Sequence, residues 1–258
     1  MDNLKGRVAV VTGASAGIGA ATAIKLVKMG MVVVGLARRY ARLEELKTFT
    51  VNNDYPGEFH SVACDLTDMD DVLKAFRWID ENIGGIHFMI NNAGIIRISS
   101  ILDGSTENWK EIIDCNVIAT TLCTREAYKS MKKHKVPNGH IIQINSITGH
   151  SYSVNPGNKV YNASKQALRV LTEGLRHELS VAGDRHIKAT SISPGFVDTE
   201  IFDAANISHS KMKSSEILSA EEMADMIIFV MSTGPNILIA EMVVLSQGRT
   251  IQTYPTKC

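Results

Sequence analysis

Short apolar runs alternate with longer amphipathic stretches along almost the whole chain. The runs are rich in β-branched residues and show no strict alternation with polar positions, which is typical of buried parallel strands. Asp68, Thr106 and Ser219 are residue types that cap helices, and each stands where a helical pattern begins. The predicted strands span residues 8–12, 31–37, 58–64, 87–91, 140–145, 187–193 and 241–245, and the predicted helices span residues 17–29, 40–53, 68–82, 106–134, 158–182 and 220–232.

This alternation predicts an α/β fold, a single-domain Rossmann-type doubly wound parallel sheet of about seven strands flanked by helices. No repeat, low-complexity stretch or linker divides the 258 residues, so we expect one domain over residues 1–258. Residues 200–219 are polar and irregular, with no helical pattern. We expect them to form a mobile substrate-binding segment that closes over bound ligands.

Composition excludes several classes of protein. The 27 acidic residues balance the 27 Lys and Arg residues, so charge favours neither nucleic acid nor an anionic membrane as a partner. No apolar stretch approaches the roughly 20 residues that span a bilayer. The four cysteines lack a disulfide framework and the eight histidines lack a metal-binding pattern, so we expect a cytoplasmic protein without a metal.

A glycine-rich turn follows the first predicted strand and leads directly into a helix. It reads Thr12-Gly-Ala-Ser-Ala-Gly-Ile-Gly19, and its glycines let backbone amides approach a pyrophosphate at the helix N-terminus. The spacing differs from the common G-x-G-x-x-G fingerprint. Residues 13–17 also match the G-x-S-x-G elbow of serine hydrolases, but only 12 residues precede them, too few for that fold. Turn glycines without a ligand are a further alternative.

Two arginines follow the second strand. Enzymes that bind NAD place a carboxylate about 20 residues beyond the glycine turn, to hold the ribose hydroxyls. Here that count ends at Ala37, and Arg38 and Arg39 come next. Because guanidinium groups bind phosphate in a bidentate manner, this position favours NADP(H) over NAD(H). Solvated surface arginines are the alternative, more so for Arg39 than for Arg38.

Tyr161 and Lys165 stand four residues apart in a predicted helix, so their side chains project from one face. An ammonium group beside a phenol stabilises the phenolate, so we expect the pKa of Tyr161 to fall from about 10. Such a phenol can exchange a proton with a carbonyl or alcohol oxygen near neutral pH.

Together these segments resemble the short-chain dehydrogenase/reductase family over residues 5–250. Two further segments, at residues 123–128 and 171–176, are similar to animal and insect members. The usual Asp-Gly-Gly after the last strand is replaced by Leu245-Ser-Gln-Gly248, which affects the expected C-terminal packing. The matching motifs are Thr12-Gly-x-x-x-Gly-x-Gly19, Asp65-Leu66, Asn91-Asn-Ala-Gly94, Asn116, Ser146, Tyr161-x-x-x-Lys165 and Pro194-Gly195.

The resemblance implies a role for each matching residue. Ser146 would hold the substrate oxygen, Tyr161 would protonate it, Lys165 would bind the nicotinamide ribose, and Asn116 would hold a water that links Lys165 to solvent. Asp65 would accept a hydrogen bond from the adenine. The implied catalytic residues are Ser146, Tyr161, Lys165 and Asn116, and the implied cofactor-binding residues are Gly13, Ser15, Gly17, Ile18, Gly19, Arg38, Arg39, Asp65, Leu66, Asn92, Ala93, Gly94, Tyr161, Lys165, Pro194, Gly195, Val197 and Thr199.

Each role has a structural alternative. Asn91 and Asn92 can tie loops to strand ends, Ser146 can be a turn residue, and Asn116 can tie a helix bend. The loop between Ser146 and Tyr161, with His150, Tyr152 and Asn155, is expected to border the substrate pocket opposite residues 200–219.

The resemblance implies a cytoplasmic NADPH-dependent oxidoreductase acting on CH–OH and C=O groups. Hydride transfer, with Tyr161 as proton donor, would reduce a hydrophobic ketone or aldehyde of the steroid, ecdysteroid or isoprenoid type. The alternatives are a catalytically silent NADPH-binding sensor or scaffold, and a methyltransferase on a similar sheet. A homodimer or homotetramer is expected through the helices at 106–134 and 158–182.

Overall fold

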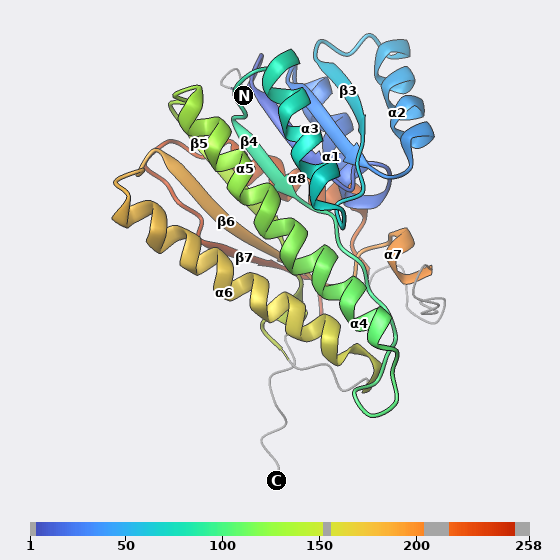
Figure 1. Ribbon diagram of the computed structural model, residues 1–258. Coiled ribbons are helices and arrows are strands. Elements are labelled where there is room, and N and C mark those ends of the chain that lie inside the picture. Colours follow the sequence, from blue (N-terminus) through green and yellow to red (C-terminus); the bar gives the residue numbers. More distant parts are fainter. Residues whose placement is uncertain (1–3, 152–155, 204–216, 251–258) are drawn as a thin grey trace.

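Seven parallel strands form one sheet in the order β3-β2-β1-β4-β5-β6-β7 (Figure 1). The structure is a computed structural model, and it describes residues 4–151, 156–203 and 217–250. The α/β prediction is therefore confirmed, and each strand ends within one residue of its predicted limits. The strands are β1 (Val8–Thr12), β2 (Val32–Ala37), β3 (Glu58–Ala63), β4 (Phe88–Asn91), β5 (Gly139–Ile144), β6 (Ile187–Pro194) and β7 (Glu241–Val244).

Helices cover both faces of the sheet. One face packs against α1 (Gly17–Lys28), α2 (Tyr40–Asn52) and α8 (Ala220–Met231). The other packs against α3 (Met69–Asn82), α5 (Thr120–Lys133) and α6 (Lys159–Val181), which cross the front of the sheet in Figure 1. The remaining helical segments are α4 (Thr106–Ile113), the π-helical turn η1 (Asp114–Ala119), the 3₁₀ turns η2 (Ile147–Gly149) and η3 (Pro156–Asn158), and α7 (Glu200–Asp203).

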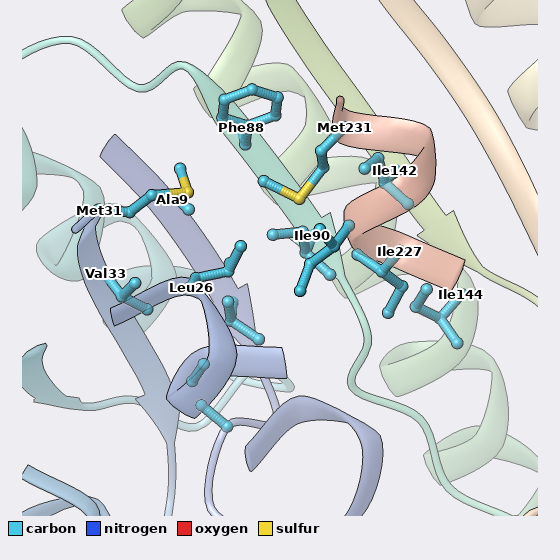
Figure 2. Close-up of a cluster of buried hydrophobic side chains, with 14 of the residues drawn as sticks. Ala9, Leu26, Met31, Val33, Phe88, Ile90, Ile142, Ile144, Ile227 and Met231 are labelled. Atoms are coloured by element: carbon cyan, nitrogen blue, oxygen red, sulfur yellow. The ribbon is translucent and has the colours of Figure 1, made fainter. Parts of the chain in front are cut away.

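Neighbouring strand residues point into two separate cores. Val11 and Ile90 pack toward α1 and α8, while Val10 and Met89 pack toward α3 and α5. All four are fully buried, and burying an aliphatic side chain of this size stabilises a protein by roughly 1.5–3 kcal/mol. This two-sided burial explains why the strands lack polar alternation. Figure 2 shows the first core, with Leu26 of α1 and Ile227 of α8 facing the strand residues Ile90 and Ile142.

The sheet changes its winding direction between β1 and β4. From β1 the chain proceeds outward through β2 to β3, and it then returns to build β4 to β7 on the other side of β1. Loops that leave the carboxyl ends of β1 and β4 therefore diverge, and a crevice opens between them. Thr12 and Asn91 end these two strands, so the motifs that follow them meet at this crevice.

Two helix predictions need correction. The stretch 106–134 is helical without a gap from Thr106 to Lys133, as predicted, but its middle is the π-helical turn η1, which lies between α4 and α5. Its N-cap is Ser105 rather than Thr106, since the Ser105 hydroxyl accepts a hydrogen bond from the Asn108 amide at 3.3 Å. Asp68 and Ser219 are confirmed as N-caps, and Ser219 forms a full capping box with Glu222.

The prediction that residues 200–219 have no helix is wrong for the first turn, because Glu200–Asp203 forms the short helix α7. Residues 204–216 of this segment lie outside the described residues, as do Tyr152 and Asn155 of the other predicted pocket loop. Among the helices that the structure describes, none is both long and apolar enough to cross a membrane.

Candidate active site

A cavity of about 900 Å³ opens at the carboxyl ends of the strands. Nearly all the site residues that were predicted from the motifs line this cavity. Gly19 and Asn116 are the exceptions, and they lie behind its wall. The predicted residues that line the cavity are Gly13, Ser15, Gly17, Ile18, Arg38, Arg39, Asp65, Leu66, Asn92, Ala93, Gly94, Ser146, Tyr161, Lys165, Pro194, Gly195, Val197 and Thr199.

The glycine-rich turn has backbone conformations and contacts that require glycine. Gly13 and Gly17 have φ angles of +68° and +53°, which residues with a side chain rarely adopt. At Gly19, a Cβ atom would lie 2.4 Å from the Gly13 carbonyl oxygen and 2.5 Å from Asn92 Nδ2. The turn thus brings its backbone to the N-terminus of α1, where the free amides and the helix dipole suit a pyrophosphate.

The two asparagines after β4 tie the centre of the sheet together. Asn92 Nδ2 donates to the Thr12 carbonyl at 2.9 Å, and the Asn92 and Ala93 amides donate to Thr12 Oγ1 at 3.0 Å each. Asn91 Nδ2 donates to Thr124 Oγ1 of α5 at 3.0 Å. The architectural alternative therefore applies to both residues, although Asn92 also lines the cavity.

Asp65 lies on the side of the cavity near β2 and β3. Its Oδ1 accepts hydrogen bonds from the Thr67 amide at 3.0 Å and from the Thr67 hydroxyl at 2.7 Å. Burial acts to raise the pKa of Asp65, but the two Thr67 hydrogen bonds and the charge of Arg38 outweigh it and lower the pKa. The ionised form of Asp65 is therefore favoured, and its carboxylate can accept a hydrogen bond from a group bound in the cavity.

Arg38 and Arg39 are both exposed at the rim of the cavity, but they have different surroundings. Arg39 donates to Ser15 Oγ through Nε and Nη2 at 3.3 and 3.2 Å, and its Nη1 lies 2.7 Å from Glu200 Oε2. Because a guanidinium keeps its protons, Arg39 cannot act as a base toward Ser15. The contacts of Ser15 therefore disfavour the serine-hydrolase alternative.

The π-helical turn η1 carries Asn116, whose side chain is 1% exposed. Its Oδ1 accepts from the Ile95 amide at 2.8 Å, and its Nδ2 donates to the Ile95 carbonyl at 2.9 Å and to Ser164 Oγ at 3.0 Å. Asn116 thus joins the helix bend, the segment after β4 and α6. π-Helical turns of this kind are often found at functional sites.

Lys165 is the most deeply buried cation of the cavity wall, with 4% of its surface exposed. Its Nζ donates to the Ile144 carbonyl at 3.0 Å and lies 5.9 Å from the centre of the Tyr161 ring. Burial lowers the pKa of Lys165 from 10.5 to about 8, since a low dielectric disfavours the ammonium form.

The prediction that the pKa of Tyr161 falls from about 10 is wrong. Burial raises the pKa of Tyr161, and a hydrogen bond with Ser146 opposes this effect only in part. Desolvation disfavours the phenolate and the ammonium alike, so it raises the pKa of the tyrosine and lowers that of the lysine. Ser146 also accepts hydrogen bonds from the Thr148 amide at 3.2 Å and from its hydroxyl at 3.0 Å, so it shapes the η2 turn as well.

The loop between Ser146 and Tyr161 was predicted to border the pocket, and it does so only in part. Ile147, Thr148 and Asn158 border the cavity, but His150 does not. The His150 Nε2 atom lies instead 3.0 Å from Ser193 Oγ and 3.1 Å from Glu241 Oε1, at the far side of the η2 turn.

The opposite wall is apolar, with one charged pair. Arg97 Nε lies 3.0 Å from Glu111 Oε2 at the edge of the cavity. Ile201 and Phe202 belong to the segment 200–219 that the sequence predicted as this wall. Ile95, Ile96 and Phe196 were missed because they lie in segments without periodicity. Only their position directly after recognised motifs could have drawn attention to them. The apolar members of the wall are Ile95, Ile96, Phe196, Ile201 and Phe202.

Known proteins share both the sequence and the fold of this chain. Residues 7–209 match the family model of the short chain dehydrogenases. The chain is 42% identical to a farnesol dehydrogenase of Aedes aegypti, with 96% of this chain and 99% of that protein covered. It is 43% identical to dehydrogenase/reductase SDR family member 11 of Gallus gallus, with 94% and 96% covered. A short-chain dehydrogenase of Burkholderia cenocepacia, solved in complex with NADP, is 27% identical with a TM-score of 0.81 and coverage of 94% and 98%.

Proposed function

The chain belongs to the short chain dehydrogenase family of oxidoreductases, and from that premise we propose that it is an NADP(H)-dependent carbonyl reductase and alcohol dehydrogenase. The observation that carries this proposal is the meeting of two sets of residues in one cavity. Ser146, Tyr161 and Lys165 line one part of it, and the glycine turn with Arg38 lines another.

The residues of the chain fit such a cofactor. The turn at Gly13 and Gly17 would receive the pyrophosphate, Arg38 the 2′-phosphate, and Asp65 the adenine amino group. The other proposed cofactor contacts are those predicted from the motifs. When bound, the cofactor donates or accepts a hydride at the carbon that carries the substrate oxygen.

The catalytic residues would manage the proton of the substrate oxygen. Ser146 donates a hydrogen bond to that oxygen and Tyr161 gives it a proton during reduction, or removes one during oxidation. Lys165 would hold a positive charge near the phenol and stabilise the phenolate against the desolvation that raises the Tyr161 pKa. Asn116 keeps the π-helical turn fixed to Ile95 and Ser164, and we retain the proposal that it holds a water linking Lys165 to solvent.

The apolar wall supports a hydrophobic substrate. Ile95, Ile96, Phe196, Ile201 and Phe202 offer a surface for a ring system or an isoprenoid chain, with few polar partners for a sugar or a small acid. Similarity to a farnesol dehydrogenase supports an isoprenoid alcohol or aldehyde, and steroid and ecdysteroid ketones fit the same surface.

A panel of carbonyl compounds, assayed with NADPH and with NADH, tests this function. We expect turnover of farnesal, ketosteroids or 3-dehydroecdysteroids, with NADPH preferred. Binding of NADPH without turnover of any carbonyl or alcohol would instead favour a catalytically silent NADPH-binding protein. A preference for NADH would contradict the proposed part of Arg38.

The remaining proposals concern organisation. We propose that residues 1–258 work as one domain in the cytoplasm. We also propose a homodimer or homotetramer through α4, η1, α5 and α6, where Ile118, Val170 and Val181 expose apolar side chains. Sedimentation as a monomer at micromolar concentration would contradict the proposed assembly.

A further inference from the structure

A cluster of charged residues joins α7 to the rim of the cavity. Glu200, the first residue of α7, binds two arginines at once. Its Oε2 lies 2.7 Å from Arg39 Nη1, and its Oε1 accepts a hydrogen bond from Arg42, in the first turn of α2. About half of each of the three side chains is exposed. Glu200 is thus a bridge between segments that are far apart in the sequence.

The backbone before Glu200 fixes its position. A Cβ atom at Gly17 would lie 2.9 Å from Thr199 Cγ2, so Thr199 packs directly on the glycine turn. Further back, the Asp198 amide donates to the Leu218 carbonyl at 2.8 Å, and the Leu218 amide donates to the Phe196 carbonyl at 2.9 Å. Glu200 therefore begins its helix from an anchored backbone beside the glycine turn. The next two residues of the helix, Ile201 and Phe202, line the substrate wall.

The two arginines of the predicted phosphate site differ in what they already bind. Nε and Nη2 of Arg39 donate to Ser15, and Nη1 binds Glu200. The Arg38 side chain makes no hydrogen bond or ion pair within the part of the chain that the structure describes, although its charge acts on Asp65. A phosphate bound at this rim would meet an Arg38 guanidinium that has no side-chain partner among the described residues. It would also meet an Arg39 guanidinium that is already paired with Glu200.

We propose that Glu200 competes with the 2′-phosphate of the nucleotide for Arg39 and Arg42, and so sets how strongly the protein prefers NADP(H) to NAD(H). This inference rests on the proposed function. A carboxylate beside a phosphate dianion repels it, so the phosphate must either displace Glu200 or bind more weakly. Glu200 thus reduces the affinity for phosphorylated nucleotides. Because Glu200 is the first residue of α7, binding of a phosphate at the rim would also act on α7 and on Phe202 of the apolar wall.

Removal of the Glu200 charge tests the competition. Glu200→Gln should bind adenosine 2′-monophosphate and NADPH roughly three- to tenfold more tightly, as expected for two half-exposed ion pairs. Binding of NADH should change by less than about twofold, since NADH lacks the phosphate. Calorimetry with adenosine 2′-monophosphate needs no turnover, and nicotinamide fluorescence reports the two dinucleotides. The gain should shrink in 0.5 M salt, because exposed charges are screened.

Glu45→Gln is the matched control. Glu45 lies on the exposed side of α2, and its charge acts on Arg42, but it makes no ion pair with Arg39 or Arg42 within the described residues. It should change neither the affinity for adenosine 2′-monophosphate nor the preference for NADPH by more than about twofold. An equal gain in this control would overturn the proposal, since a general charge effect would then explain the result.

Two further outcomes separate this inference from the proposed function. If Glu200→Gln binds adenosine 2′-monophosphate as the unchanged protein does, or more weakly, Glu200 only holds α7 in place and the competition is refuted. NADPH-dependent carbonyl reduction would stand in that case. If the unchanged protein binds NADH but neither NADPH nor adenosine 2′-monophosphate, the proposed cofactor fails and the competition fails with it.

Discussion

The cavity holds its cations in two contrasting regions. One is the floor, formed by Ser146, Tyr161 and Lys165. The other is the rim, formed by Arg38, Arg39 and Glu200, together with Arg42, which binds Glu200 from α2. Lys165 is buried, and its Nζ donates to a backbone carbonyl, so burial alters its pKa. Arg39 and Arg42 are about half exposed and pair with a carboxylate that water also reaches.

This difference concerns dielectric environment rather than residue type. A charge in the floor has lost most of its water, and its proton equilibrium responds to small changes nearby. An ion pair at the rim exchanges readily with water and salt, and it contributes little to the free energy of folding. The floor is therefore suited to proton chemistry. The rim is suited to exchanging one anion for another.

Lys165→Met should produce the largest effect, because it removes the charge near Tyr161 and keeps an apolar side chain of similar length. We expect turnover to fall by about 10²–10⁴-fold, the usual size of a general acid–base contribution. Steady-state rates with NADPH and a substrate from the carbonyl panel measure this loss. Arg42→Gln removes a cation of the rim and serves as the control. A loss of similar size in the control would remove the distinction between floor and rim.

The free energy of unfolding should depend on pH through Lys165. The folded state releases the lysine proton near pH 8, whereas the unfolded state holds it to about 10.5. The unfolded state thus binds more protons between these values, so the contribution of Lys165 to stability rises with pH over this window, by up to about 3 kcal/mol. Urea unfolding without nucleotide, compared with Lys165→Met from pH 7 to 10, measures it. A pH-independent difference between the two proteins would contradict burial of the charged amine.

Asn116→Ala should destabilise the π-helical turn. It removes the hydrogen bonds of the buried Asn116 side chain to the Ile95 amide, the Ile95 carbonyl and Ser164, which costs about 1–3 kcal/mol. Chemical unfolding gives the loss, and the exposed α3 residue Asn82, replaced by Ala, provides the control with a loss below about 0.5 kcal/mol. Similar losses in both variants would mean that Asn116 is not the tie between η1 and the segment after β4.

Arg42→Gln should produce the smallest effect on stability. A half-exposed ion pair adds little in water, so the midpoint of thermal unfolding should move by no more than about 2 °C. The shift should vanish in 0.5 M salt. Calorimetric melting at low and high salt measures it, and a drop of 10 °C would show that the rim is part of the structural core.

The sequence predicted most of the fold because its signals are local. Runs of β-branched residues such as Val8–Thr12 mark the strands, and glycines that need a positive φ angle mark the turn at Gly13 and Gly17. The order of the motifs then brought almost every site residue to one cavity. These features depend on neighbours in the chain, so they can be predicted without knowing how distant segments pack.

The features that the sequence did not predict depend on packing between distant segments. The extra residue of a π-helical turn leaves the polarity pattern nearly unchanged, so the π-helical turn at Asn116 was not expected. The Tyr161 pKa depends on burial by several elements, and only the fold reveals that desolvation outweighs its neighbours. Arg39 and Glu200 are separated by 161 positions, and no local spacing indicates their pairing.

Tyr161→Phe tests the central claim most directly, because it removes one hydroxyl from the floor and leaves the rim intact. NADPH binding, followed by nicotinamide fluorescence, and single-turnover reduction of a carbonyl substrate should be measured on the same sample. We predict that NADPH binds within about threefold of the unchanged protein while reduction falls by at least about 10²-fold. Undiminished reduction in this variant would contradict the assignment of Tyr161 as the proton donor.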